Sequence, residues 1–205
     1  GIYLVGGCIR DTLSGKEVTD IDFAIDIDPE EVVKTLSNNN IKFYDIGINY
    51  GTVTAVIDSK NYEITSLRED IETDGRHAKV KYTSDIKADS LRRDFTINAI
   101  YANRDGELFD FHNGIDDIEN RNLKFIGSAN DRVKEDYLRI LRYFRFYADF
   151  SNFEIDANLK KVFKEGSKNF SKISKERIWT ELKLSLIHIS EPTRPLYISY
   201  AVFCL

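Results

Sequence analysis

The chain of 205 residues has no methionine, one tryptophan, two cysteines, three prolines and three histidines. Cys8 and Cys204 lie near opposite ends, which is no disulfide framework and indicates a reducing compartment, so we expect a cytoplasmic location. His77, His112 and His188 are too scattered for a histidine-rich metal site. No apolar run reaches the roughly 18 residues that a spanning helix needs, and no basic region precedes the first strand-like residues. We therefore expect no signal peptide and no contact with a membrane.

The composition is that of an ordinary globular protein, with 42% hydrophobic and 31% charged residues. It excludes disorder, collagen-like repetition and a coiled coil. The net charge of −5 is unevenly placed, because residues 1–130 hold 15 basic and 24 acidic side chains whereas residues 131–205 hold 14 and 10. An acidic first part and a basic second part of the chain suit a metal-dependent domain joined to one that contacts polyanions. On charge alone, however, two solvated surfaces of different sign are the simpler explanation.

The first part of the chain is predicted to have an α+β fold. Short runs rich in β-branched and aromatic residues predict strands at 2–6, 21–25, 52–57, 61–67 and 107–111. Asp58-Ser59-Lys60 joins two of these strands at hairpin length, and Pro29 to Leu36 reads as a short helix with proline in its first turn. The charged stretch from Glu69 to Lys81 has no apolar period and is expected to be a mobile loop.

From Asp131 the pattern becomes helical. One continuous helix with Asp131 as its N-cap is predicted by an apolar stripe at Val133, Tyr137, Ile140, Leu141, Phe144 and Ala148. Two more helices are expected at Ala157–Phe163 and Lys175–Leu184, the latter capped by Ser174. We thus expect a domain at 1–128, a helical domain at 129–185, and a tail at 186–205 that has lost the charge density of the rest and is expected to be non-native.

The first group of residues that could carry chemistry is GGCIRD (6–11), followed by DID (20–22). Side chains alternate along a strand, so Asp20 and Asp22 are expected on one face, where two carboxylates can hold a pair of Mg²⁺ ions. Gly6 and Gly7 let backbone amides approach a triphosphate, and Arg10 adds positive charge there. A solvated acidic strand gives the same DxD letters, but the GG-x-x-R-D just upstream favours the functional interpretation.

Glu63, on the strand YEITSLR, could supply a third carboxylate, or it could be a surface acid paired with a lysine. LRRDFTINAI (91–100) places Arg92 and Arg93 for contact with phosphates, and Asp94 for contact with ribose hydroxyls. Asn98 follows Asp94 by one helical turn. The alternative for this segment is an amphipathic helix start with its apolar residues inside, namely Leu91, Phe95, Ile97 and Ile100.

The third group lies in KEDYLRILRYFRF (134–146). On one helix, Asp136 and Arg139 are neighbours and could present a carboxylate acceptor and a guanidinium donor side by side. Such a pair complements a nucleobase edge, because the carboxylate accepts from an exocyclic amino group while arginine donates to a ring nitrogen or carbonyl. Ordinary ion pairs on a solvated helix are the alternative.

Several segments occur in the order and spacing of one family: GGCIRD, DID, GTVTAV, YEITSLR, LRRDFTINAI, DFHNGIDDI, a strand expected at LKFIG, and EDYLRILRYFRF. From Ile2 to about Leu184 the chain resembles the class II tRNA nucleotidyltransferases, the CCA-adding enzymes and their bacterial poly(A) polymerase relatives. The resemblance implies a nucleotidyltransferase head, a small mixed β-sheet flanked by helices, followed by an all-helical neck. It implies truncation too, because the family's helix before the GG strand and its helical body after the neck are not found in this sequence.

The resemblance also assigns roles to residues of this sequence. Asp20 and Asp22 would be the catalytic carboxylates that bind Mg²⁺. The incoming nucleotide would be bound by Gly7, Arg10, Arg92, Arg93, Asp94, Asp136, Arg139, Arg142 and Arg145. Glu135 belongs to the same ED-x-x-R motif, and Asp110 to Asp117 resembles the hinge between head and neck. Residues 171–184 resemble the neck helix.

The implied reaction is metal-assisted nucleotidyl transfer from CTP and ATP to the 3′ end of tRNA, adding C, C and A without a nucleic-acid template. A poly(A) polymerase, or an enzyme that adds only CC or only A, has the same motifs. A non-catalytic RNA-binding module is the alternative of another class, and the presence of both Asp20 and Asp22 argues against it.

Overall fold

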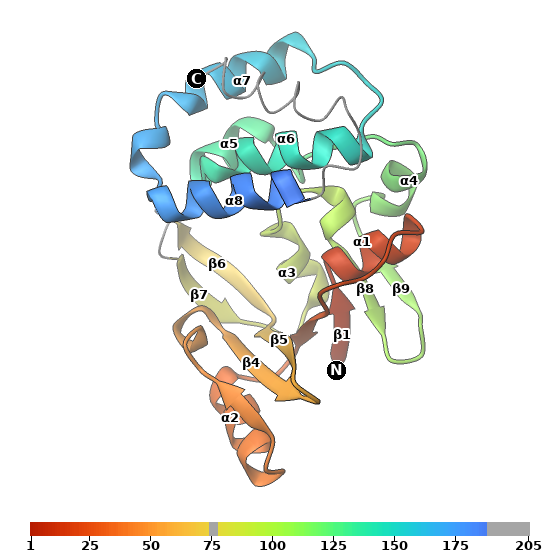
Figure 1. The fold of residues 1–205 in the computed structure, drawn as a ribbon, viewed down its shortest axis with the longest axis vertical. Helices are drawn as coiled ribbons and strands as arrows, with labels where there is room; N and C mark the ends of the chain where they lie inside the picture. Colours follow the sequence, from red (N-terminus) through yellow and green to blue (C-terminus); the bar gives the residue numbers. More distant parts are fainter. Residues whose placement is uncertain (74–77, 188–205) are drawn as a thin grey trace. The chain divides into compact units, whose positions relative to one another are not determined.

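The computed structural model describes residues 1–73 and 78–187, and the chain divides into two compact units (Figure 1). The first unit, ending at Glu119, combines strands with short helices, and the second, from Asn120, is helical. The sequence-based domain boundary falls later, between residues 128 and 129. Of the predicted tail at 186–205, everything from residue 188 lies outside the described residues.

Seven strands of the first unit form one sheet in the order β3-β4-β5-β2-β1-β8-β9. The sheet is mixed because β2 and β5 run parallel whereas its other neighbouring pairs are antiparallel. The strands are β1 (Ile2–Val5), β2 (Asp22–Ile25), β3 (Lys42–Tyr44), β4 (Thr52–Ile57), β5 (Lys60–Ser66), β8 (Ile100–Asn103) and β9 (Leu108–Asp110). The strands predicted at 2–6, 21–25, 52–57, 61–67 and 107–111 are confirmed, and β3 and β8 were not predicted. The strand expected at LKFIG (123–127) is wrong, because the described residues there form no strand.

The turn between β4 and β5 shows how local sequence sets the register. Asp58 and Ser59 have φ angles of 50° and 62°, and Ile57 pairs with Lys60 across a two-residue turn. Left-handed backbone at both central positions matches the twist of the flanking strands, and aspartate tolerates it better than most residues. The hairpin expected at Asp58-Ser59-Lys60 is confirmed.

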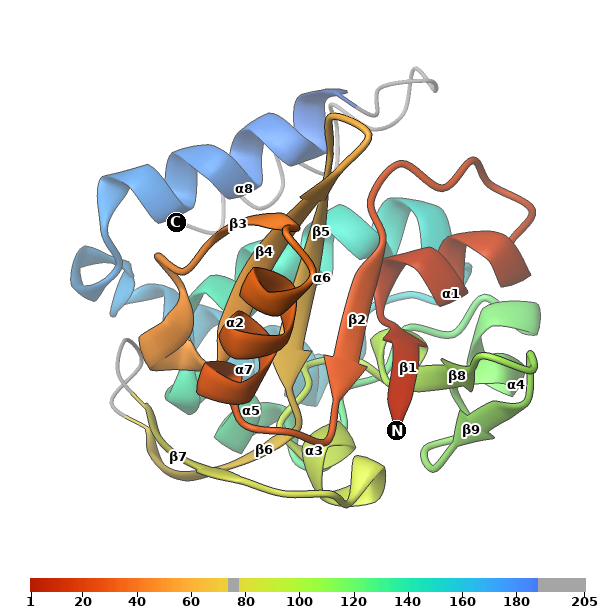
Figure 2. The ribbon, with the colours of Figure 1, turned by 90° about the horizontal axis from the view of Figure 1, so that it is seen from below.

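Four helices accompany this sheet: α1 (Gly7–Leu13), α2 (Pro29–Asn38), α3 (Ile86–Leu91) and α4 (Gly114–Glu119). Val32 and Leu36 of α2 pack against Val53 and Ala55 of β4, and Figure 2 shows α2 lying along the strands there. A second buried cluster joins β1, β2 and β8 through Val5, Ala24, Leu67 and Tyr101. The predicted α+β fold is therefore confirmed.

The stretch expected to be a mobile loop is instead a hairpin. β6 (Arg68–Thr73) and β7 (Ala78–Tyr82) pair antiparallel, with Glu69 opposite Lys81. Opposite charges facing each other across two strands stabilise the pair without any alternation of apolar residues. Strand prediction from the sequence relied on such alternation and therefore missed these strands. The expectation of a loop over Glu69–Lys81 is wrong for the described residues, and residues 74–77 lie outside them.

The second unit contains α5 (Ala129–Glu135), α6 (Leu138–Phe150), α7 (Ala157–Ser167) and α8 (Lys175–Ile187). The prediction of one continuous helix from Asp131 is wrong, because the chain leaves helical geometry at Asp136, with φ −151° and ψ 107°. The Asp136 side chain, which lies just before the N-cap residue Tyr137, accepts from the backbone N–H of Leu138 at 3.1 Å, where α6 starts. Ser128, not Asp131, caps α5, while Ser174 contacts the N–H of Arg177 at 3.4 Å, as expected of a cap for α8.

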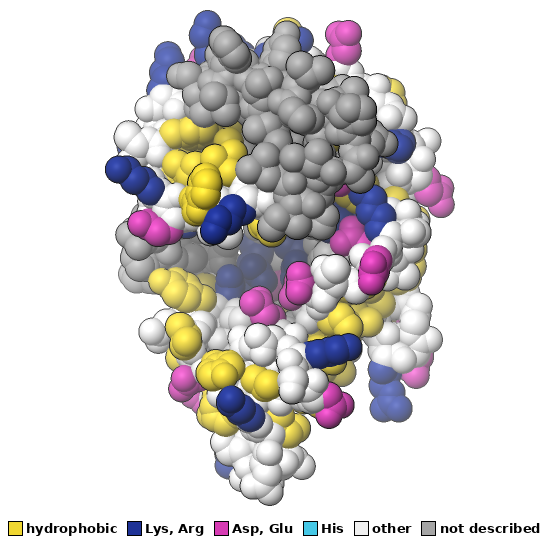
Figure 3. Space-filling model, viewed as in Figure 1, with side chains coloured by type: hydrophobic (Ala, Val, Ile, Leu, Met, Phe, Trp, Pro, Cys, Tyr) yellow, Lys and Arg dark blue, Asp and Glu magenta, His cyan; other side chains and the backbone are white. Residues whose placement is uncertain are grey.

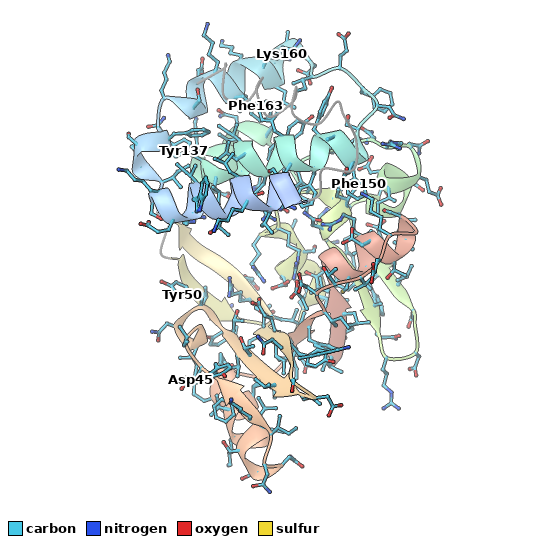
Figure 4. All side chains as sticks on the ribbon, viewed as in Figure 1. Asp45, Tyr50, Tyr137, Phe150, Lys160 and Phe163 are labelled. Atoms are coloured by element: carbon cyan, nitrogen blue, oxygen red, sulfur yellow. The ribbon has the colours of Figure 1, made fainter. Side chains whose placement is uncertain are left out.

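An aromatic cluster holds α6 and α7 together. Phe163 of α7, labelled in Figure 4, lies 4.9 Å from Tyr143 and 5.4 Å from Phe144, measured between ring centres. Phe125 stacks on Tyr143. Close packing explains Gly166, where an added Cβ would lie 2.7 Å from Val133 and 2.8 Å from Ile140. The helical unit therefore has a core of its own.

The surface is mixed, with apolar side chains between charged ones on the face drawn in Figure 3. Trp179 of α8 is 56% exposed, and the ammonium group of Lys183 lies 5.4 Å from the centre of its ring. In the first unit, Tyr44, Ile46 and Tyr50 are exposed around β3.

No helix in the described part of the chain is long and apolar enough to cross a bilayer.

Candidate nucleotide and metal site

The turn after β1 brings backbone close to two charged side chains. Gly6 has φ 76° and ψ −127°, a combination open in practice only to glycine. A Cβ built on Gly6 would lie 3.6 Å from Nη1 of Arg93 and 4.0 Å from Oδ2 of Asp22. The GG pair therefore leaves room beside a guanidinium and a carboxylate, as the sequence predicts for the approach of a phosphate group.

Arg10 on α1 donates to the side chains of Asp11 and Asn98. Its Nε and Nη2 donate to both carboxylate oxygens of Asp11, at 2.9 and 2.8 Å, while Nη1 donates to Oδ1 of Asn98 at 2.7 Å. Asn98 in turn donates to Oδ1 of Asp94 at 3.1 Å. The two sequence groups that contain Arg10 and Asp94 thus meet in one hydrogen-bonded chain, although they are far apart in the sequence.

Asp22 is the first residue of β2 and sits opposite Glu63 in the parallel register of β2 with β5. Burial is the largest cause that raises the pKa of Asp22, and the neighbouring charges of Glu63 and Asp20 raise it further, whereas Arg93 and Arg10 lower it. Asp20 lies before the strand and is exposed. The prediction that alternation along one strand puts Asp20 and Asp22 on the same face is therefore wrong. The charge of Asp20 nevertheless acts on Asp22.

Repulsion among carboxylates is the feature that a cation would relieve. No group of three or more His, Cys, Asp and Glu side chains in the described ranges is arranged to enclose a metal ion. Magnesium is ordinarily bound by one or two carboxylates together with water and substrate phosphates, so a closed cage is not required. Asp22, with Asp20 and Glu63 acting on it, fits such an open site in its donor chemistry.

Arg92, Arg93 and Asp94 follow α3 and precede a 3₁₀ turn at Thr96–Asn98. Phe95, Ile97 and Ile100 are fully buried, as the alternative of an amphipathic helix start requires. Leu91 is 52% exposed, so that alternative is wrong for Leu91. Asp94 is buried too, and its Oδ1 accepts from the backbone N–H of Phe95 at 2.8 Å.

In the helical unit, the predicted base-reading residues are each in an ion pair. Nη1 of Arg139 lies 2.6 Å from Oε2 of Glu135, and Nη2 of Arg177 from α8 lies 2.6 Å from Oδ2 of Asp136. Asp136 and Arg139 do not share a helix, contrary to the prediction, because the chain breaks between α5 and α6. They remain close along the chain, since the Arg139 N–H donates to the Asp136 carbonyl at 3.0 Å.

Arg142 and Arg145 of α6 meet one acidic residue, Glu181 of α8. Glu181 is buried and its Oε1 pairs with Nε of Arg145, while its Oε2 lies 3.8 Å from Nη1 of Arg142. The Arg145 guanidinium also lies 4.0 Å from the ring centre of Phe146. Arg177 and Glu181 were not predicted, and their only sequence signal is the spacing of four within the expected helix, which places both on one face.

Asp110 and Asp117, expected at a hinge, have structural partners. Asp110 accepts from the backbone N–H groups of Gly114 and Ile115 at 2.9 and 2.8 Å, and Oδ2 of Asp117 accepts from the Thr96 hydroxyl at 2.8 Å. Both aspartates therefore hold α4 in place within the first unit. Motion about this segment stays a prediction.

Comparison with known proteins is consistent with this arrangement. Residues 2–124 match a family model described as the Poly A polymerase head domain. The chain is 42% identical over 189 residues to the CCA tRNA nucleotidyltransferase 1, mitochondrial, of Danio rerio, covering 91% of this chain and 44% of that protein. It is 40% identical over 187 residues to the CCA-adding enzyme of Lactobacillus delbrueckii subsp. bulgaricus, covering 90% and 46%.

Among solved structures, the Bacillus stearothermophilus CCA-adding enzyme in complex with CTP matches with a TM-score of 0.78 at 31% identity. That match covers 90% of this chain and 44% of the other. The chain thus spans a little under half the length of the curated relatives described here.

Proposed function

Because the chain belongs to the Poly A polymerase head domain family, we propose that it carries the catalytic part of an enzyme that adds C, C and A to the 3′ end of tRNA. The substrates would be CTP and ATP, and no nucleic-acid template would be used. The observation that carries this proposal is the placement of Asp22 beside Glu63, with Arg93 and Gly6 next to it. The names of the relatives support the choice of tRNA and of CCA addition.

We infer that Asp20 and Asp22 are the catalytic carboxylates and would hold Mg²⁺. Magnesium bound there would assist ionisation of the RNA 3′-hydroxyl and neutralise charge on the departing pyrophosphate. Arg10 and Arg93 would hold the triphosphate, with Arg92 and Gly7 beside it and Asp94 toward the ribose. Catalysis would come from positioning and from fixed charge, because no protein nucleophile is needed for this transfer.

The helical unit would select the base. Asp136 and Arg139 would present an acceptor and donors to cytosine or adenine, and the cations of Arg142 and Arg145 would complete the nucleotide site. A poly(A) polymerase, or an enzyme restricted to CC or to A, fits the same residues. A non-catalytic RNA-binding module would need no repelling carboxylates at Asp22 and Glu63.

We place the reaction in the cytoplasm, away from membranes, on the two widely separated cysteines of the sequence. The Danio rerio relative is mitochondrial by name, so subcellular fractionation decides between these compartments. Recovery of the protein with mitochondria would overturn the cytoplasmic assignment while leaving the chemistry untouched.

Incorporation of labelled CTP and ATP, each alone and then together, tests the function on tRNA ending before CCA, after CC, and complete. The full-length protein is compared with Asp20→Asn, Asp22→Asn and the exposed-carboxylate control Asp105→Asn. We expect the unmodified protein to add two C residues and then one A. The rate should be about a thousandfold lower in Asp22→Asn, because the negative charge of the Asp22 carboxylate is lost. Asp105→Asn should react normally.

Other product patterns separate the alternatives. Addition of A only after CC indicates an A-adding enzyme, and long runs of A on any RNA indicate a poly(A) polymerase. RNA binding without incorporation, together with Mg²⁺-independent nucleotide binding, would support the RNA-binding module and contradict catalysis.

A further inference from the structure

Asp89, near the end of α3, is a charged side chain with no exposure to solvent. An ionised carboxylate is expensive to bury unless donors satisfy it. Its Oδ1 accepts from the Arg68 backbone N–H at 3.0 Å and from Nε of Arg92 at 2.8 Å. Its Oδ2 accepts from the Tyr101 hydroxyl at 2.6 Å and from Nη2 of Arg93 at 3.3 Å. Four donors, from β6, from β8 and from the segment that follows α3, therefore converge on one residue.

The charge state of this cluster is fixed by its surroundings. Burial alone would raise the pKa of Asp89, but the charges of Arg92 and Arg93 and the Tyr101 hydroxyl outweigh it and hold the pKa below its ordinary value. Burial raises the pKa of Tyr101 far above its ordinary value, so the phenol stays a donor. Asp89 is thus an acceptor, and Tyr101 a donor, throughout the neutral range.

The cluster determines the direction of the Arg93 guanidinium. Nε of Arg93 donates to the Tyr101 hydroxyl at 2.9 Å, and Nη2 to Asp89, so two of its three nitrogens are tied on one side. The third, Nη1, donates to the Asn98 carbonyl at 3.5 Å and lies 3.6 Å from the point where a Cβ on Gly6 would stand. The ring of Tyr101, 5.2 Å from the guanidinium carbon, restricts its rotation further.

We propose that Asp89 is a positioning residue for nucleotidyl transfer: together with Tyr101 it presets the Arg93 guanidinium so that Nη1 faces the Gly6 turn, where the triphosphate would bind. This inference deepens and rests on the proposed function. Asp89 would not touch the substrate and would act through Arg93. A preset guanidinium loses less side-chain entropy on binding phosphate than a free one does.

The test measures binding of Mg²⁺-CTP and of Mg²⁺-ATP to the full-length protein by calorimetry, with CMP as the comparison ligand. We expect Asp89→Asn to weaken CTP and ATP about ten- to a hundredfold, as for loss of a charge-assisted contact, and Tyr101→Phe about threefold to tenfold. CMP, which lacks the β- and γ-phosphates, should lose less than about twofold. Damage to the fold as a whole would weaken CTP and CMP alike.

A double-mutant cycle separates positioning from general support. If Asp89 acts through Arg93, Asp89→Asn costs little further affinity in an Arg93→Gln background, so the two effects are far from additive. Asp117→Asn is the matched control, because Asp117 is also a buried aspartate of this unit, bonded to the Thr96 hydroxyl. It should leave the ratio of CTP to CMP affinity unchanged.

The outcomes are distinguishable. Absence of Mg²⁺-dependent CTP or ATP binding by the unmodified protein would contradict the proposed function itself. Normal binding by the unmodified protein, with additive effects of Asp89→Asn and Arg93→Gln or equal losses for CTP and CMP, would overturn only the role of Asp89. If Asp89→Asn does not fold, Tyr101→Phe decides by the same ratio and the same cycle with Arg93→Gln.

Discussion

Gly6 and Gly106 share a left-handed backbone, with φ of 76° and 84°, but differ in what surrounds them. Nothing lies within 4 Å of a Cβ built on Gly106, whereas one on Gly6 would project toward Arg93 and Asp22. We expect Gly6→Ala and Gly106→Ala each to lower the free energy of unfolding by about 1–2 kcal/mol, because alanine resists positive φ. Only Gly6→Ala should also weaken CTP binding, by about tenfold.

Urea denaturation measures the shared backbone cost of these two variants, and calorimetric titration with CTP measures the difference between them. Equal nucleotide affinity in the two variants would show that the space beside Gly6 is not used by the ligand.

His112 makes stability depend on pH in the mildly acidic range. Its Nε2 lies 2.9 Å from the Ser90 hydroxyl. Burial is the largest cause that lowers the pKa of His112 below its ordinary value, Asp110 opposes it, and Lys87 lowers it further. The folded chain therefore takes up this proton less readily than the unfolded chain does. Stability is expected to rise with pH between the lowered folded pKa and the unfolded value near 6.5, and to fall on acidification through that window.

His112→Gln tests the pH effect, since glutamine keeps a polar partner for Ser90 but does not titrate. Urea midpoints at pH 7.5 and 5.5 should differ less in His112→Gln than in the unmodified chain, because all other groups titrate alike in both. An unchanged pH dependence would assign the effect to other residues.

At the scale of elements, the break between α5 and α6 shows why the apolar stripe wrongly predicted one continuous helix from Asp131. The apolar stripe continues from Val133 through Tyr137 to Ile140 whether or not the backbone bends, so periodicity cannot detect the break. The bend depends on Asp136, whose carboxylate caps Leu138 and pairs with Arg177, forty-one residues further on. A local pattern cannot reveal a partner so distant in sequence. Five strands of the large sheet were predictable because strand composition and the two-residue turn are local signals, whereas β3, β8 and the strand order were not predicted.

Helix α8 is attached to α6 through the buried carboxylate of Glu181. Glu181→Gln would leave Arg142 and Arg145 facing a neutral amide, so we expect the free energy of unfolding to fall by about 2 kcal/mol. Glu176→Gln, an exposed change on the same helix, should cost less than about 0.5 kcal/mol. Urea denaturation of both variants gives the comparison, and equal costs would show that the Glu181 ion pairs contribute nothing beyond a surface charge.

At the scale of the whole molecule, a chain of net charge −5 is proposed to bind a polyanion. Attraction must then come from local basic surface, such as the exposed Lys160 and Lys164 on α7. We expect affinity for tRNA to fall steeply with salt, the logarithmic slope being about −0.9 per phosphate contacted in duplex regions. The double variant Lys160→Ala/Lys164→Ala should flatten the slope, whereas Lys60→Ala, in the β4–β5 turn region, should not.

Fluorescence anisotropy of labelled tRNA between about 50 and 200 mM salt measures these slopes. A slope near zero, or equal slopes in all variants, would remove the helical unit's lysines from the RNA contact.

The sequence predicted those residues of the candidate site whose chemical type suits metal or phosphate binding. Asp22, Arg10 and Arg93 were identified because carboxylates, glycines and guanidinium groups suit metal and phosphate. Asp89 and Glu181 were not, since a buried acid looks like any surface acid in the sequence, and only the fold shows which cations it meets. Supporting residues are therefore the part of such a site that requires a structure.

Trp179 is the single indole of the chain, half exposed on α8, between Arg177 and Glu181. In a protein of these 205 residues, excitation near the long-wavelength edge of protein absorption therefore reports on one known position. Its emission wavelength and its quenching by iodide or acrylamide would follow the environment of α8 during a titration with nucleotide, without an attached dye.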